Sequence, residues 1–150
     1  MKRFIVLMMV AAITVCSFGF AAAGSSSEEA RAMVDKAAAY VQADGKDKAL
    51  KEFNNPNGKF VKGDLYIFAY DMNGTLIAHP INAKLVGMNL LNAPDIDGKF
   101  YRREIIELAK KSGSGTVDYK YKNPANGKIE HKTTHLKRAG DMVICCGAYK

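Results

Sequence analysis

Residues 64–80, DLYIFAYDMNGTLIAHP, constrain the fold of this chain more than any other stretch. The first half is predicted to be a strand, whose alternate side chains point to opposite faces. One face would carry Leu65, Ile67 and Ala69. The other would carry Tyr66, Phe68 and Tyr70. Because neither face is polar, the strand has to be central in a sheet that is covered on both sides. Asn73-Gly74 supplies the positive φ angles of a tight hairpin turn, so a second strand is expected before Pro80.

Residues 1–23 have the three parts of a secretory signal peptide: basic residues at the start, an apolar run over 4–15 and three alanines at the end. We therefore expect cleavage after the alanines and one domain over residues 24–150. The mature protein would lie in the periplasm or be secreted. An uncleaved N-terminal membrane anchor, or a lipoprotein modified at Cys16, is the alternative.

The formal net charge of +7 would fall to +5 once Lys2 and Arg3 leave with the signal peptide. A mildly positive exported protein favours encounters with small anions such as carboxylates. The basic residues are dispersed along the chain, and export argues against nucleic acid as a partner. No second apolar run of about 18 residues follows, so no second membrane span is expected.

The rest of the chain predicts helices and antiparallel strands in an α+β domain. One helix is expected over residues 25–53 with a break at Asp44, and another over residues 99–111 with Asp97 as its N-cap. Two capping boxes are candidates for the first start, Ser25 with Glu28 and Ser26 with Glu29. Further strands are expected over residues 116–122, 129–139 and 142–149. With the hairpin they make a sheet of about five strands.

Residues 81–98 form an irregular stretch with a high apolar content. Gly87, Pro94 and Gly98 argue against a regular element. Six apolar residues argue against disorder: Leu85, Val86, Met88, Leu90, Leu91 and Ile96. Because a loop of this length and composition must pack onto something, we expect it to cover the second face of the sheet and to enclose a small-molecule pocket.

Five segments, in this order, resemble the single Cache domain, an extracellular sensor module of the PAS-like fold. They are DLYIFAYDMNGTLIAHP, KLVGMNLL, REIIELAKKSGSG, VDYKYKNPANGKIEHKTTHLKR and GDMVICCGAYK. Together they cover most of residues 28–150. The resemblance implies a long N-terminal helix on one face of the sheet and a ligand pocket on the other, beneath the 81–98 loop. It also implies a small organic ligand, which in that family is often a carboxylate or an amino acid.

The chain departs from the family's pattern in its ending and at two histidines. Most relatives lie between two membrane spans of a receptor, whereas this chain ends at its last predicted strand. We therefore expect a stand-alone exported form that signals through a separate membrane receptor. His79 is followed by Pro80 where the family has glycine, and His135 stands where the family has tyrosine.

A pocket for a small anion needs a cation, fixed hydrogen-bond donors and an apolar wall. Lys132, in a lysine-threonine pattern like the family's, would supply the cation, and Arg103 would add a bidentate contact. Arg102 is expected to be a solvated surface charge. The aromatic residues Tyr66, Phe68, Tyr70 and Tyr101 are expected to supply the walls of the pocket and its hydroxyl donors. His79, at the end of the second hairpin strand, is a further candidate for contact with the ligand. The alternative for these residues is packing in the core, with His79 as a hydrogen-bonded structural histidine.

Motifs of catalysis and cofactor attachment are absent from the sequence, which has no nucleophile elbow, phosphate loop, CxxC or CxxCH. His131 and His135 lie four apart in a predicted strand, which separates them by about 13 Å and prevents them from sharing a zinc ion. We therefore expect a non-enzymatic protein that binds a small organic ligand and has no cofactor or metal.

Two other functions stay open from the sequence. A structural or interaction module would have its pocket filled by its own side chains. A thiol redox protein would use Cys145 and Cys146, although neighbours in a strand point to opposite faces and a bond between them would be strained.

Overall fold

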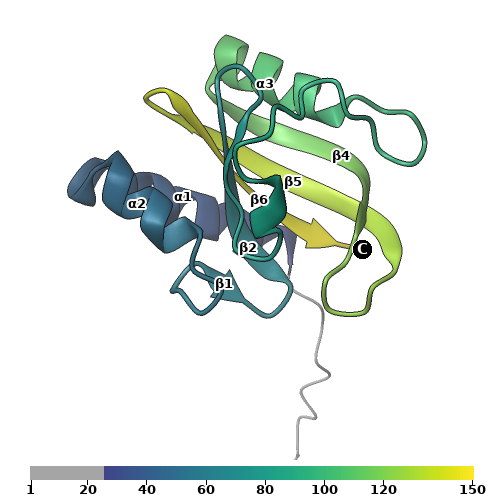
Figure 1. The fold of residues 1–150 in the computed structure, drawn as a ribbon, viewed down its shortest axis with the longest axis horizontal. Coiled ribbons are helices and arrows are strands. Elements are labelled where there is room, and N and C mark those ends of the chain that lie inside the picture. Colours follow the sequence, from purple (N-terminus) through teal and green to yellow (C-terminus); the bar gives the residue numbers. More distant parts are fainter. Residues whose placement is uncertain (1–25) are drawn as a thin grey trace, which may run out of the picture.

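The computed structural model describes residues 26–150, so the predicted signal peptide, Cys16 and the Ser25 capping position lie outside the described residues. An antiparallel sheet runs through the molecule in the order β1-β2-β6-β5-β4, with β3 paired to β2 (Figure 1). Its strands are β1 Val61–Lys62, β2 Leu65–Asp71, β3 Leu76–Ala78, β4 Ser114–Lys122, β5 Ile129–Ala139 and β6 Met142–Tyr149. The predicted α+β class is confirmed, and the short edge strand β1 adds to the five expected strands.

Two successive helices cover one face of the sheet (Figure 1). They are α1 (Ser27–Asp44) and α2 (Lys46–Phe53), separated at Gly45, whose φ is +84°. The second candidate capping box is present: Ser26 Oγ accepts from Glu29 N at 3.1 Å, and Glu29 Oε2 accepts from Ser26 N at 2.8 Å. The buried stripe of α1 consists of Ala30, Val34, Ala37 and Ala38.

On the other face lie α3 and the loop before it (Figure 1). α3 spans Tyr101–Ser112, and the prediction of Asp97 as its N-cap is wrong. The N-cap position is Phe100, which makes no side-chain capping bond. Asp97 lies outside the helix because the Asp95 carboxylate accepts from the backbone N–H groups of Asp97 and Lys99, at 3.0 and 2.9 Å, and closes a separate turn.

The 81–98 loop packs against the sheet and is pinned to β3. Leu76 N donates to Met88 O at 3.0 Å, and Gly87 N donates to Leu76 O at 2.7 Å. Within the loop, Ala83–Leu85 forms one turn of 3₁₀ helix, and Leu90 is buried. Part of the apolar content of the loop is therefore used in packing, whereas Met88 and Ile96 are exposed.

The sheet separates two apolar cores. The residues of each core show which face of β2 packs against α1 and α2 and which face packs against α3 and the 81–98 loop. The core against α1 and α2 includes Leu65, Ile67 and Ala69. The core against α3 and the loop includes Tyr66, Phe68 and Tyr70. Cys145 and Cys146 are divided in the same way, and both thiols are free. The aromatic face of β2 is thus the one beneath the 81–98 loop.

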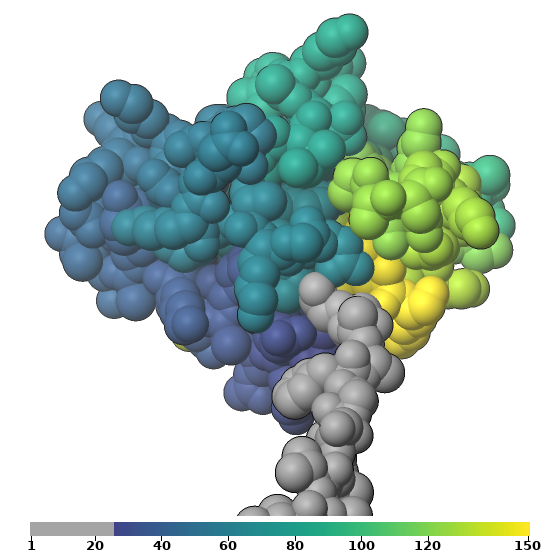
Figure 2. Space-filling view, turned by 90° about the horizontal axis from the view of Figure 1, so that it is seen from below, coloured from purple at the N-terminus to yellow at the C-terminus, as the bar shows by residue number. Residues whose placement is uncertain are grey.

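The start of α1 and the end of β6 lie on the same side of the molecule (Figure 1 and Figure 2). Both are tied to β5: Ser27 Oγ lies 2.7 Å from His135 Nε2, and Lys150 N donates to His131 O at 2.9 Å. Within residues 26–150, the helices are all too short or too polar to cross a membrane.

Candidate functional site

Two adjoining cavities lie on the α3 side of the sheet, an inner one of about 10 Å³ and an open outer one of about 720 Å³. The inner cavity is lined by Tyr66, Phe68, Tyr70, Leu76, His79, Leu85, Leu90, Tyr101, Arg102, Tyr119, Tyr121 and Lys132. Tyr101, Arg102 and Tyr121 line both cavities. These three side chains therefore form the boundary between the two spaces.

Lys132 lies on β5, and its side chain is buried, with only 1% of the residue exposed. Its side chain crosses β6 at Gly147, where an added Cβ would overlap the lysine's aliphatic carbons. Glycine at this position is therefore what admits a long side chain into the core. Lys132 Nζ donates to Tyr66 Oη at 2.8 Å and to Tyr149 Oη at 3.2 Å.

The Lys132 ammonium is held by phenols and aromatic rings. Among residues 26–150, no carboxylate lies within ion-pair distance of its Nζ. Ring centroids lie 4.4–5.3 Å from Nζ in Tyr66, Phe68, Tyr121 and Tyr149. Burial lowers the pKa of Lys132 to about 7, against the opposing influence of Cys146, Cys145 and Asp64. An anion placed beside Nζ would favour the charged form again.

Four tyrosines of the inner cavity are neutral hydrogen-bonding groups. Burial raises the pKa of Tyr66, Tyr70, Tyr101 and Tyr119. Tyr101 and Tyr119 stack with ring centroids 3.7 Å apart and planes 6° apart, which fixes α3 on β4. The neutral hydroxyls can both donate and accept, so they suit a polar ligand of either sign.

Two neighbouring arginines of α3 have opposite environments, and the expectation for Arg102 is wrong. Arg102 is 7% exposed; it donates to Tyr70 Oη at 3.3 Å and to Ala93 O at 2.9 Å. Arg103 is exposed, donates to Asn92 Oδ1 at 2.6 and 3.0 Å, and does not line the inner cavity. Arg102 is buried because it precedes Ile105, Ile106 and Ala109 by three, four and seven residues and so shares their helix face.

His79 joins the hairpin to the loop. Its Nδ1 accepts from Ile81 N at 3.3 Å and from Asn82 N at 2.9 Å, so the proton of the neutral ring lies on Nε2. The ring packs against Tyr66 and Phe68 with centroids 5.0 and 5.9 Å away. Burial lowers the pKa of His79 to about 3, assisted by the charges of Lys132 and Arg102. His79 therefore holds the start of the loop while its ring forms part of the cavity wall.

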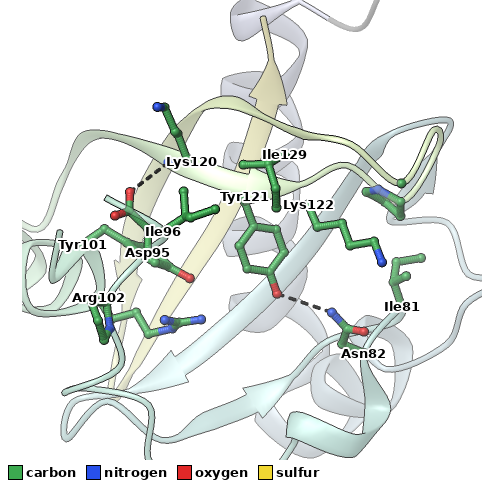
Figure 3. Close-up of a pocket in the computed structure, with 13 residues that line it drawn as sticks. Ile81, Asn82, Asp95, Ile96, Tyr101, Arg102, Lys120, Tyr121, Lys122 and Ile129 are labelled. Atoms are coloured by element: carbon green, nitrogen blue, oxygen red, sulfur yellow. Dashed lines mark hydrogen bonds between the residues drawn. The ribbon is translucent and has the colours of Figure 1, made fainter. Parts of the chain in front are cut away.

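The outer cavity opens beside Tyr121 (Figure 3). Asn82 Nδ2 donates to Tyr121 Oη at 3.3 Å, which joins the loop to β4. In the view of Figure 3, the Arg102 guanidinium lies on one side of the Tyr121 ring, and Ile81 and Lys122 lie on the other. Tyr121 and Arg102 thus line the outer cavity together, with Ile81 across the tyrosine ring from the guanidinium in this view.

Six of the seven residues predicted for the site line the inner cavity, namely Tyr66, Phe68, Tyr70, His79, Tyr101 and Lys132. Arg103 is the exception. Sequence reasoning missed Arg102, Tyr119 and Tyr121 as site residues. The alternation in β4 and the helical period of α3 were the signals that could have found them.

Two other chemistries find little support in the described residues. Within residues 26–150, no group of three or more His, Cys, Asp or Glu side chains could hold a metal ion. Cys145 and Cys146 are both fully buried in different cores. Burial raises the pKa of the Cys146 thiol to about 12, which disfavours the reactive thiolate.

An antiparallel sheet with a long N-terminal helix on one face and a loop-covered cavity on the other defines a PAS-like sensor-domain fold. Residues 25–150 match the single Cache domain 2 family, and the chain belongs to that family. A solved periplasmic sensor domain of a chemotaxis protein has the same fold, with a TM-score of 0.65 and 23% identity over 81% of this chain and 88% of that one.

Two further solved structures and one curated protein are also similar to this chain. A methyl-accepting chemotaxis protein from Vibrio parahaemolyticus has a TM-score of 0.70 and 21% identity over 81% of this chain and 86% of that one. A Cache chemosensory domain described in terms of carboxylic acid recognition has a TM-score of 0.63 and 24% identity over 81% and 86%. The methyl-accepting chemotaxis protein McpP of Pseudomonas putida is 28% identical over 88 residues, 57% of this chain. The match spans 16% of that receptor's length.

Proposed function

We propose that this protein is an exported sensor domain that binds a small carboxylate in the inner cavity, without catalysis, and signals its bound state to a separate membrane receptor. The observation that carries the proposal is the pair of buried cations, Lys132 and Arg102, in a cavity lined by no carboxylate of the described chain. A buried charge without a counter-ion costs free energy, and a carboxylate ligand would supply that counter-ion.

The remaining groups of the cavity fit the same ligand. Arg102 has five N–H donors and spends two of them on Tyr70 and Ala93, so donors remain for a carboxylate. The hydroxyl oxygens of Tyr66 and Tyr149 accept from Lys132 Nζ. Tyr149 Oη donates its proton to Lys122 O at 3.2 Å, so Tyr66 is the hydroxyl of this pair that would donate to a carboxylate placed beside Nζ. The carboxylic acid recognition described for a structural relative supports this ligand class.

The small size of the inner cavity favours a second candidate, a structural module whose pocket is filled by its own side chains. A volume of about 10 Å³ is room for roughly one water molecule. Binding therefore requires movement of Tyr121 or of the 81–98 loop, whereas a structural module requires none. Titration with ligands separates the two candidates.

The experiment is isothermal titration calorimetry, with thermal shift as a second readout, on the purified protein with acetate, propionate, lactate, pyruvate and succinate. Lys132→Met is compared with Lys137→Met, which removes an exposed lysine of the same strand that pairs with Asp35. We expect binding by the wild type and Lys137→Met, and its loss in Lys132→Met. Absence of binding for every carboxylate would favour the structural module. Equal binding by Lys132→Met and the wild type would overturn the proposed site, because the ligand would then not depend on the Lys132 ammonium.

A further inference from the structure

Lys132 is a buried amine whose hydrogen-bond partners suit its neutral form as well as its charged form. The residue is only 1% exposed, and it forms no ion pair with any carboxylate of residues 26–150. Its Nζ lies 2.8 Å from Tyr66 Oη and 3.2 Å from Tyr149 Oη. A phenol hydroxyl can accept from an ammonium and can also donate to the lone pair of a free amine. Tyr66 can therefore hydrogen-bond to Lys132 in either protonation state.

The same burial sets Lys132 apart from a surface lysine at neutral pH. Because burial lowers its pKa to about 7, about three quarters of the side chain is the free amine at pH 7.5. An exposed lysine with the usual pKa of about 10.4 is a free amine in about one molecule in a thousand at that pH. Only the unprotonated nitrogen can attack an electrophile. Lys132 therefore presents on the order of 600 times more nucleophile than an exposed lysine does.

The cavity that Lys132 lines admits only very small electrophiles without rearrangement. Its volume is about 10 Å³, which holds roughly one water molecule. Keto acids and the larger aldehydes have to push the surrounding side chains apart. Carbon dioxide is linear, has three atoms and carries no charge, so it needs little room and loses little hydration on entry. It therefore fits this cavity better than these carbonyl compounds do.

The cavity also holds the counter-ion that a carbamate needs. Arg102 lines the same space and is 7% exposed. It donates to Tyr70 Oη and to Ala93 O, and the rest of its five N–H donors stay available for another acceptor. Addition of carbon dioxide turns the lysine amine into an anion in the same cavity as this buried cation, so the two charges balance. An imine formed with an aldehyde brings no negative charge. The charge of the cavity therefore favours carbon dioxide as the electrophile.

We infer that Lys132 is a site of reversible carbamate formation with carbon dioxide, and that Arg102 is the counter-ion of the carbamate. The Nζ lone pair forms a bond to the carbon of carbon dioxide, while one carbon–oxygen π bond breaks and its electron pair becomes the negative charge on oxygen. Nζ then releases one proton to the solvent. Free amine and carbon dioxide thus give carbamate and a proton, and nothing is oxidised or reduced. Carbamate formation goes beyond the proposed function and does not depend on it, because carboxylate binding uses the protonated lysine.

The experiment is carbon-13 NMR of the purified protein at pH 7.5 with labelled bicarbonate, which equilibrates with carbon dioxide. The test variants are Lys132→Met and Arg102→Met. Lys137→Met, at a lysine of β5 whose side chain is 45% exposed, and Arg103→Met, at the exposed neighbour of Arg102, are the matched controls. A trialkyloxonium salt converts a carbamate into a stable ester, and peptide mass spectrometry then locates the modified residue. Circular dichroism shows whether each variant is folded.

We expect a carbamate resonance that is present in the wild type and in both control variants and is lost in Lys132→Met. In Arg102→Met the carbamate occupancy should fall by at least about tenfold. A carbamate on the N-terminal amine persists in every variant, which distinguishes it from the resonance of Lys132. Absence of a resonance that depends on Lys132 overturns the inference and leaves the proposed function standing. A Lys132-dependent resonance of unchanged intensity in Arg102→Met overturns the role of Arg102. The proposed function fails separately if a protein that forms the carbamate binds no carboxylate in calorimetry.

Discussion

Lys132 Nζ lies 2.8 Å from Tyr66 Oη, and this pair joins the central strand β2 to β5 across β6 inside the core. The acceptor is a phenol rather than a carboxylate, so the lysine is solvated by the protein but not neutralised. Such a site gives up folding free energy in its unliganded state and recovers it when an anion binds. The same relationship leads to predictions for stability and for binding.

Replacing Lys132 with methionine should stabilise the fold in acid and neutral solution. Burial lowers its pKa in the folded protein to about 7 from the usual 10.5, so its cost to stability is full below pH 7 and disappears as pH rises past 10.5. We expect Lys132→Met to raise the free energy of unfolding by about 1–3 kcal/mol at pH 6, after the loss of two hydrogen bonds. Urea unfolding measures this, and a loss of stability at pH 6 would contradict it.

Carboxylate affinity should fall as pH rises above neutrality. Lys132 has a pKa of about 7 in the free protein, and only the protonated amine attracts the anion, which itself stays ionised over this range. The dissociation constant should therefore increase by up to about tenfold per pH unit above pH 7. Calorimetry at pH 8 in buffers of different ionisation enthalpy should show proton uptake on binding. An affinity that is flat from pH 6 to 9 would disprove this role of Lys132.

Acid should loosen the hairpin–loop junction through His79. Its pKa of about 3 in the fold lies below the usual 6.5, so the stability it contributes is present above pH 6.5 and is lost as pH falls toward 3. The loss amounts to about 4 kcal/mol. His79→Asn keeps an acceptor for the loop N–H groups but binds no proton, so its stability deficit relative to wild type should shrink between pH 6.5 and 4.

Thermal unfolding over that pH range is the measurement. His131→Asn, a change at an exposed histidine of β5, is the control, because it removes no contact to the loop. A deficit of His79→Asn that stays constant with pH would mean that protonation of His79 does not limit acid stability.

Substitutions of the two neighbouring arginines of α3 should have different effects on carboxylate affinity and on stability. Arg102→Met removes a buried cation and leaves Ala93 O without its donor, so carboxylate affinity should fall at least about tenfold and stability by about 1–2 kcal/mol. Arg103→Met removes an exposed contact to Asn92, and it should change the free energy of carboxylate binding and that of unfolding by less than about 0.5 kcal/mol each. Equal effects of the two variants in calorimetry and urea unfolding would refute the assignment of Arg102 to the site.

Much of the architecture was predictable because its signals are local. The alternation in β2 and the Ser26–Glu29 capping box each depend on residues close in sequence, and both were found. The turn at Asn73-Gly74 is also present, but only Gly74 has the positive φ, at +86°, that was expected of both residues. The N-terminus of α3 was misplaced, because the turn closed by Asp95 competes with Asp97 as a helix cap. Asp95 and Asp97 are both plausible turn or capping residues from the sequence. Which of them closes a turn and which caps the helix depends on the three-dimensional position of the surrounding chain.

By itself the sequence determined that the central strand needs two covers, that an aromatic face exists, and that a lysine follows in a later strand. The tertiary structure alone decided that the aromatic face lies beneath the loop, that Arg102 rather than Arg103 turns inward, and that Gly147 makes room for Lys132. The reason is physical. Periodicity fixes which side chains share a face, but burial of a charge depends on which distant strands and helices exclude water from it.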